Sequence, residues 1–126
     1  MLRFILCDDD ELQLDEIAGF IRQWADTNKI NVEISQFTSG KAVLEQFQPQ
    51  RNDIVICDIM MPDMDGLTLA NSLRSLRPDF HIIFMSSSKD FALQAYDAHP
   101  YGYLVQPCSY EAFSALLGNL MQKVRM

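Results

Sequence analysis

The sequence has few cysteines, no cluster of positive charge and no long apolar segment. Its three cysteines are an odd number at wide spacing, and no pair has metal-ligand spacing, so a disulfide framework is not expected. No stretch approaches the roughly 18 apolar residues that cross a bilayer. The apolar run Leu2–Cys7 is too short for a signal peptide and leads directly into acids. We therefore expect a cytoplasmic protein without membrane contact.

The charge balance excludes one common class of partner. The net charge is −7, and the ten Lys and Arg residues are scattered along the chain. Such a surface repels phosphate backbones, so we expect no direct nucleic-acid contact by this chain. A length of 126 residues with 48% hydrophobic residues predicts a single domain, residues 1–126, around one core.

Apolar runs of strand length alternate with segments of helical spacing. The expected strands are Leu2–Cys7, Val32–Phe37, Asp53–Asp58, His81–Met85 and Tyr101–Val105. A helical segment follows each of them; a short one covers Asp90–Asp97, and the last begins near Ser109, a suitable N-cap. Five such units predict an α/β fold, three-layered and doubly wound like flavodoxin. In such folds a common strand order of the five-stranded parallel sheet is 2-1-3-4-5.

Acidic residues follow two of the expected strands. Asp8-Asp9-Asp10 comes after the first strand, and Asp58 comes at the end of the third. The strand order makes these two strands neighbours, so Asp8, Asp9 and Asp58 are expected to converge at one edge of the sheet. A few oxygen ligands suit Mg²⁺. The alternative interpretation of Asp8-Asp9-Asp10 is a solvated turn between strand and helix, in which Asp10 or Glu11 favours the helix N-terminus.

Four motifs, in order and each at a strand end, resemble the receiver (REC) domain of bacterial two-component response regulators across essentially the whole chain. They are Cys7-Asp8-Asp9-Asp10-Glu11, Asp58-Ile59-Met60-Met61-Pro62-Asp63-Met64-Asp65-Gly66, Ser86, and Tyr103-Leu104-Val105-Gln106-Pro107. The turn acids Asp63 and Asp65 are expected to shape the second motif, with Gly66 supplying a backbone conformation that a tight turn demands. The stretch Phe91–Asp97 is similar to receivers that precede LytTR-type DNA-binding domains. A transcription-regulating output domain beyond Met126 is therefore expected.

The resemblance implies a role for each acid. Asp58 would be the phosphoacceptor, which takes a phosphoryl group from a phosphohistidine on a sensor histidine kinase. Asp8, Asp9, Asp58 and the backbone carbonyl of Met60 would hold Mg²⁺, because a carboxylate attacks a charged phosphoryl group poorly without a metal. The domain would be a signalling module and not an enzyme, apart from its own phosphotransfer and slow autodephosphorylation.

The resemblance also implies a switch. The Ser86 hydroxyl would bond the new phosphoryl group and Tyr103 would turn inward; from the residues alone, Ser86 begins a polar loop and Tyr103 packs as a strand aromatic. The surface formed by residues 90–97, residues 101–105 and the last helix would be a homodimer or effector contact. A pure interaction module that uses this surface is a second possible function.

One position departs from the family pattern. Gln106 stands where receivers carry a lysine, directly before Pro107, whose peptide bond the family makes cis. A neutral amide replaces a charge-assisted bond, so we expect a loss of about 1–3 kcal/mol in the phosphorylated state. In one outcome Mg²⁺ and Ser86 suffice and the domain is phosphorylated but switches weakly, the outcome we favour. In the other, the chain is an atypical receiver that acts through phosphate-independent protein contacts.

A different class also uses an aspartate at a strand end. Small Mg²⁺-dependent phosphohydrolases of the haloacid-dehalogenase type begin with an Asp-x-Asp motif, which Asp8 to Asp10 imitates. Leu12 stands where that motif usually continues with threonine, and the chain leaves no room for a cap domain. This interpretation remains a remote alternative.

Overall fold

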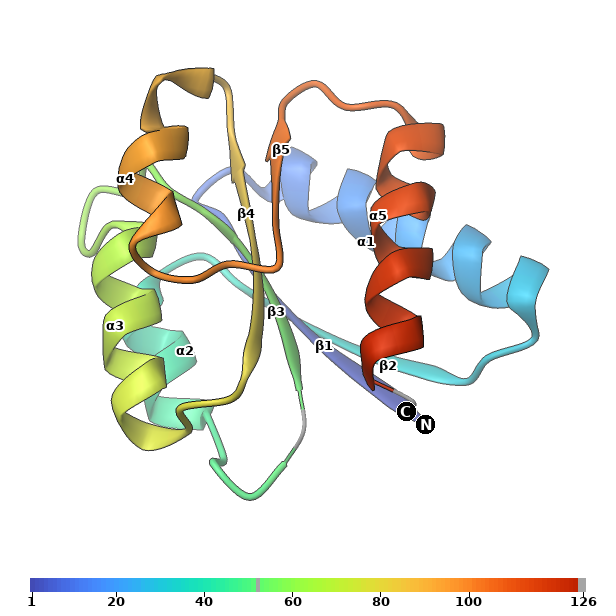
Figure 1. The fold of residues 1–126 in the computed structure, drawn as a ribbon, viewed down its shortest axis with the longest axis horizontal. Helices are drawn as coiled ribbons and strands as arrows, with labels where there is room; N and C mark the ends of the chain where they lie inside the picture. Colours follow the sequence, from blue (N-terminus) through green and yellow to red (C-terminus); the bar gives the residue numbers. More distant parts are fainter. Residues whose placement is uncertain (52, 125–126) are drawn as a thin grey trace.

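Five parallel strands form one sheet in the order β2-β1-β3-β4-β5 in the computed structural model, which describes residues 1–51 and 53–124 (Figure 1). The strands are β1 (Leu2–Cys7), β2 (Val32–Phe37), β3 (Ile54–Asp58), β4 (His81–Ser86) and β5 (Gly102–Val105). The predicted fold class and strand order are confirmed. Strand ends differ by one residue from the expectation at β3, β4 and β5.

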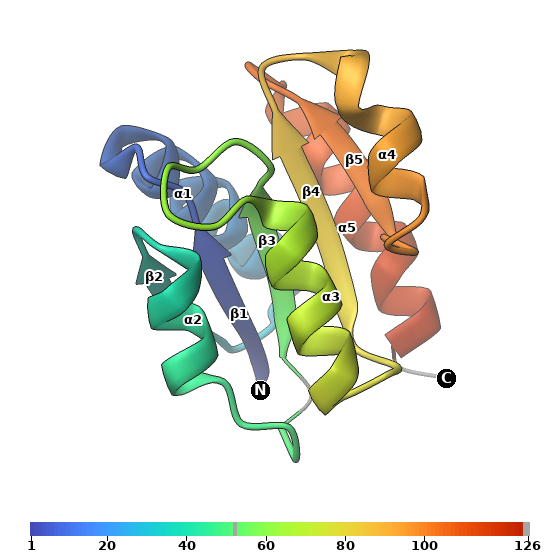
Figure 2. The same ribbon diagram turned by 90° about the vertical axis from the view of Figure 1, so that its left-hand side faces the viewer.

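Helices cover both faces of this sheet. The helical elements are α1 (Glu11–Asn28), α2 (Gly40–Gln46), α3 (Gly66–Leu76), the 3-10 turn η1 (Lys89–Phe91), α4 (Ala92–Tyr96) and α5 (Tyr110–Val124). α1 and α5 lie on one face, and α2, α3 and α4 lie on the other (Figures 1 and 2). The segment expected as one helix over Asp90–Asp97 is thus shorter and begins with a 3-10 turn.

The sheet separates two apolar layers. Phe4 and Leu6 of β1 belong to the layer under α1 and α5, whereas Ile5 and Cys7 belong to the layer under α2, α3 and α4. This alternation follows from the two-residue period of a strand. In β3 the first four residues, 54–57, are all fully buried, as a central strand with helices on both faces requires. The middle of the sheet is therefore a rigid support for the residues at its ends.

Side-chain caps fix where the helices begin. The Asp10 carboxylate accepts a hydrogen bond from the backbone N–H of Leu12 at 3.0 Å, and Asp65 accepts one from Thr68 at 2.7 Å. Ser109 caps α5 in the same way, as predicted. Asp10 and Asp65 therefore stabilise helix N-termini, because a capping side chain satisfies an otherwise unpaired N–H group.

Arg74 of α3 joins three segments at the amino end of the sheet. Its guanidinium donates hydrogen bonds to four carbonyl oxygens, those of Pro78 (3.1 Å), Phe80 (2.9 Å), Ala98 (2.7 Å) and His99 (3.1 Å). It also lies 4.5 Å from the ring centre of Phe80, and burial lowers its pKa from the ordinary value. The loop after α4 is thereby tied to α3 and to the approach to β4.

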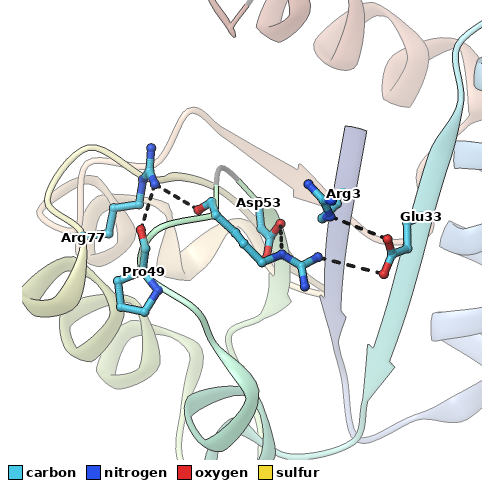
Figure 3. Close-up of polar contacts among 6 residues, drawn as sticks. Arg3, Glu33, Pro49, Asp53 and Arg77 are labelled. Atoms are coloured by element: carbon cyan, nitrogen blue, oxygen red, sulfur yellow. Dashed lines mark hydrogen bonds and ion pairs between the residues drawn. The ribbon is translucent and has the colours of Figure 1, made fainter. Parts of the chain in front are cut away.

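A second polar network closes the same end beside it (Figure 3). Arg51 pairs with the buried Asp53 at 3.5 Å and with Glu33 at 3.9 Å. Arg77, just after α3, donates to the carbonyls of Pro49 at 2.8 Å and of Arg51 at 3.0 Å. These bonds anchor the segment before β3. None of the helices in the described ranges is long and apolar enough to cross a membrane.

Candidate functional site

Three carboxylates meet at the carboxyl end of the sheet. Asp8 and Asp9 follow β1 and Asp58 ends β3, and these strands pair directly, with Cys7 opposite Cys57. One oxygen from each of the three carboxylates lies within 4.8 Å of the others. Asp8 is buried, Asp58 is half-buried and Asp9 is exposed. The structure thus brings the three predicted acids together, with their carboxylate oxygens in one cluster.

This grouping makes two of the carboxylates weak acids. Burial raises the pKa of Asp8 from 3.8 to about 7, and the charges of Asp58 and Asp9 add to the rise. Burial raises the pKa of Asp58 to about 6, with a further contribution from Asp9. Backbone N–H groups offset part of both shifts; that of Asp10 donates to Asp8 at 2.9 Å. Concentrated negative charge with oxygen donors fits a small divalent cation such as Mg²⁺.

Met60 lies in the loop directly after Asp58. Its backbone N–H donates to the Asp58 carboxylate at 3.4 Å, and its side chain is exposed. Met60 also lines the pocket that contains Asp8, Asp9 and Asp58. Met60 therefore lies in the loop beside the three acids, and the contact of its carbonyl with a metal stays a prediction.

Gly66 is constrained by neighbouring backbone atoms and not by its own backbone angles. No glycine among the described residues has a positive φ, so the expectation of a special backbone conformation is wrong. Instead, a Cβ atom at Gly66 would collide with the carbonyl oxygen of Asp58 and would lie 3.0 Å from the Cα of Ile59. The N–H of Gly66 donates to the Ile59 carbonyl at 2.8 Å. α3 therefore begins against the backbone of Asp58, an approach that only glycine permits.

Ser86 and Tyr103 are connected through one loop. Ser86 is buried at the end of β4, and its hydroxyl accepts a hydrogen bond from the N–H of Ser88 at 3.1 Å. The Tyr103 hydroxyl donates to the Ser88 carbonyl at 2.6 Å, and the ring packs partly buried beside the layer under α4. Both hydroxyls therefore bond the backbone of Ser88, and the switch roles of Ser86 and Tyr103 stay predictions.

Gln106 lies at the acid pocket, and its amide is held by neighbours. Its Nε2 donates to the Met85 sulfur at 3.1 Å, and its Oε1 accepts from the N–H of Cys108 at 3.1 Å. The side chain is buried, and the peptide bond to Pro107 is cis. The pocket lining given by the described part of the chain contains no Lys or Arg. Lys89, three residues beyond Ser86, is the sequence's remote candidate for a cation that could substitute for the missing lysine; its side chain lies outside the described part of the chain.

The sequence alone did not single out two further residues of this pocket. Gln13, in the first turn of α1, and Ser87, in the loop after β4, both line it. Ser87 follows directly after Ser86, and Gln13 lies in the first turn of the helix that starts directly after Asp8-Asp9-Asp10. Their position beside the acid motifs is the signal that could have identified them.

Comparison with known proteins agrees with this geometry. The family model "Response regulator receiver domain" matches residues 4–117. The transcriptional regulatory protein RprY of Bacteroides fragilis is 27% identical over 98% of this chain and 51% of its own length. YesN of Bacillus subtilis, an uncharacterized transcriptional regulatory protein, is 29% identical over 99% of this chain and 34% of its own. The chain thus spans about half or less of these relatives.

Solved structures show the same fold. The response regulatory domain of protein mrkE from Klebsiella pneumoniae superposes with a TM-score of 0.84 at 24% identity, with 97% of each chain covered. The response regulator TrrA from Thermotoga maritima, solved in complex with Mg²⁺-BeF, gives 0.82 at 22% identity, covering 95% of this chain and 99% of the other. Because the family model covers most of the sequence, this chain belongs to the response regulator receiver domain family.

Proposed function

We propose that this receiver accepts a phosphoryl group on Asp58 from a phosphohistidine of a sensor histidine kinase. The observation that supports the proposal most is the convergence of three carboxylates at the ends of β1 and β3. A structural role alone does not account for it, since the acid that caps α1 is Asp10 and not Asp8 or Asp9. The metal ligands would be Asp8, Asp9, Asp58 and the Met60 carbonyl.

In the transfer, an oxygen of the Asp58 carboxylate forms a bond to phosphorus while the bond between phosphorus and the kinase histidine breaks. The histidine nitrogen leaves with the electron pair and takes up a proton. Asp58 must be ionised to attack, and its pKa of about 6 leaves most of it charged at neutral pH. Bound Mg²⁺ would neutralise charge on the phosphoryl oxygens. In this proposal the Ser86 hydroxyl would donate a hydrogen bond to the phosphoryl group of the product.

Acetyl phosphate with Mg²⁺ tests the proposal directly. Intact-mass spectrometry should show the addition of one phosphoryl group to the wild-type chain and none to Asp58→Asn. Asp63→Asn removes an exposed acid from the neighbouring loop and is the matched control, which should be modified like the wild type. Modification of Asp58→Asn to the same extent would show that another residue is the acceptor.

Because Gln106 replaces the usual lysine, a competing interpretation is a receiver that works without phosphate. We propose that phosphorylation occurs but is less favourable than in a receiver with lysine. Gln106→Lys should then raise the yield or the lifetime of the adduct, by roughly 5- to 150-fold for a gain of about 1–3 kcal/mol. Gln122→Lys on the exposed side of α5 adds the same charge elsewhere and should change neither. If the wild type forms no adduct under conditions that modify an ordinary receiver, the phosphate-independent function is favoured.

The relatives named as transcriptional regulators support a proposal about the wider role of this receiver. We propose that residues 1–126 form the receiver domain of a cytoplasmic regulator with a DNA-binding output domain. A homodimer through α4, β5 and α5 is the contact we expect; LytTR membership stays a prediction. The haloacid-dehalogenase interpretation is not favoured by the family match. Steady release of phosphate from a model ester would be needed to support it.

A further inference from the structure

Three sulfur atoms gather directly beneath the acid site, on the face of the sheet covered by α2 and α3. Cys7 and Cys57 are paired residues of the neighbouring strands β1 and β3, and both side chains belong to the same apolar layer. Both are fully buried. Because directly opposite residues of parallel neighbours point to the same face, the two thiols lie side by side in this layer.

The third sulfur comes from the loop after β3. The Sδ atom of Met61 lies 3.5 Å from the Sγ atom of Cys7, and its side chain is 9% exposed. Met61 packs in the same layer as the two cysteines. The chain therefore brings together two thiols and a thioether that are far apart in sequence, with Met61 nearest to solvent.

We propose that Cys7, Cys57 and Met61 form a binding site for a soft monovalent metal ion, with Cu(I) as the natural occupant. Thiolate and thioether ligands select Cu(I), whereas Mg²⁺ takes oxygen ligands. Metal–thiolate bonds are about 2.3 Å long in zinc sites, so an ion in the plane of three sulfurs needs them about 4 Å apart. The observed 3.5 Å between two of the sulfurs is close to this spacing.

A disulfide and simple apolar packing both fit the geometry less well. A disulfide needs Cβ atoms about 3.5–4.5 Å apart. Directly opposite residues on strands about 4.8 Å apart do not easily reach that separation. Apolar packing is the usual role of buried cysteines, but it does not require a methionine sulfur against one of them. In this structure the Cys7 thiol donates to the Met61 sulfur at 3.5 Å and the Cys57 thiol donates to the Asp58 carbonyl at 3.1 Å. A bound ion would replace the first of these weak hydrogen bonds with bonds to all three sulfur atoms.

Binding would change the charge and the mechanics of the region. The ion displaces a thiol proton, and loss of one proton from the two thiols leaves a neutral complex, which suits a buried position. Cys7 precedes Asp8 and Cys57 precedes Asp58, so an ion between the sulfurs would tie together the strand ends that carry the carboxylates. The inference does not depend on phosphorylation of Asp58.

The test uses anaerobic Cu(I) with bicinchoninate as a coloured competing chelator. The starting protein is Cys108→Ser, which removes the third cysteine; Cys108 lies beside the layer on the opposite face of the sheet. This variant should retain one Cu(I) per chain. Cys7→Ala or Cys57→Ala removes a direct ligand and should weaken Cu(I) binding by more than roughly 100-fold, the upper end of the loss seen when a residue that only supports a ligand is changed. Met61→Leu should weaken Cu(I) binding by about tenfold.

A spectroscopic measurement covers the case in which a cysteine variant does not fold. X-ray absorption at the copper edge of the Cys108→Ser protein should show a first shell of three sulfur atoms. The proposal is overturned if the chelator removes all the copper, if the three substitutions leave affinity unchanged, or if the first shell is nitrogen and oxygen. Loss of two hydrogen masses on mild oxidation with peroxide, without copper retention, would instead indicate a disulfide.

Discussion

Replacing Asp8 with asparagine should stabilise the metal-free protein while removing a ligand of its candidate metal site. Asparagine keeps the shape of the side chain and an oxygen that can accept the N–H of Asp10. It removes a buried charge beside two other carboxylates; the exposed fraction of Asp8 is only 4%. Selection for a metal site rather than for stability would account for the presence of such a costly charge.

The size of the effect follows from the pKa of Asp8, which is about 7 in the folded protein against an ordinary 3.8. A raised carboxyl pKa means that the folded state binds the proton more tightly than the unfolded state. The stabilisation is therefore complete below pH 3.8 and is lost as the pH rises through 7. At 1.36 kcal/mol per pKa unit, the full loss is on the order of 4 kcal/mol.

Urea unfolding of both proteins between pH 4 and pH 8, without divalent cations, measures this. The advantage of Asp8→Asn should grow from below about 1 kcal/mol at pH 4 to about 4 kcal/mol at pH 8. Added Mg²⁺ should narrow the difference in stability at pH 8, because it should stabilise the folded wild type by binding it, whereas the variant lacks one of the ligands. Asp63→Asn, which changes an exposed acid, should alter stability by less than about 0.5 kcal/mol at either pH.

Two results would refute this reasoning. A gap that does not grow with pH would show that Asp8 is not a weak acid in the folded state. If the variant is less stable than the wild type at pH 8, the Asp8 carboxylate must have a stabilising interaction that outweighs its burial and the repulsion from the neighbouring acids.

Three other perturbations test parts of the fold that support the site. Gly66→Ala should lower the free energy of unfolding by about 1–3 kcal/mol and weaken Mg²⁺ binding, because its Cβ meets the Asp58 carbonyl. Gly19→Ala, with open space around it in α1, should instead stabilise by about 0.5–1 kcal/mol; equal effects in urea unfolding would disprove the contact argument. Arg74→Met should lower stability by about 2–4 kcal/mol, and hydrogen exchange should speed up in residues 98–101, since four carbonyls lose a donor. Asp53→Asn should cost about 1–3 kcal/mol by thermal unfolding, because Arg51 loses its buried partner; an unchanged melting temperature would show that the pair contributes nothing.

The central strands β3 and β4 were predictable because burial on two faces imposes a nearly continuous apolar pattern on them. The short, all-apolar run of residues 54–57 is typical of a central parallel strand, and the acids at the strand ends then followed from parallel topology. The Ser109 cap was predictable for a similar reason, because a hydroxyl before an apolar stripe has a local partner.

Contacts between distant segments were not predictable. The interpretation of Gly66 as a turn residue failed because its constraint comes from the Asp58 carbonyl, a through-space neighbour. Nothing in the local pattern around Cys7 indicates that Met61 lies against it. The short α4 was overestimated because its stretch contains helix-forming residues but no side-chain cap. Such features depend on packing, which single-sequence patterns describe poorly.

Helix α4 is held at both of its ends, by Arg74 at the amino end of the sheet and by the loop after β4 at the carboxyl end. Two hydrogen bonds from Arg74, to the carbonyls of Ala98 and His99, hold the loop after α4, and two more reach the segment before β4. The segment before α4 is held by the bond of the Tyr103 hydroxyl to Ser88 and by the hydrogen bonds to the Ser86 and Ser88 hydroxyls. A change beside Asp58 therefore reaches α4 through the serine loop after β4, where Ser87 lines the acid pocket and Ser88 bonds Tyr103. Arg74 holds the other end of the helix at the opposite end of the sheet from the acid site, so the two ends of α4 belong to separate parts of the molecule.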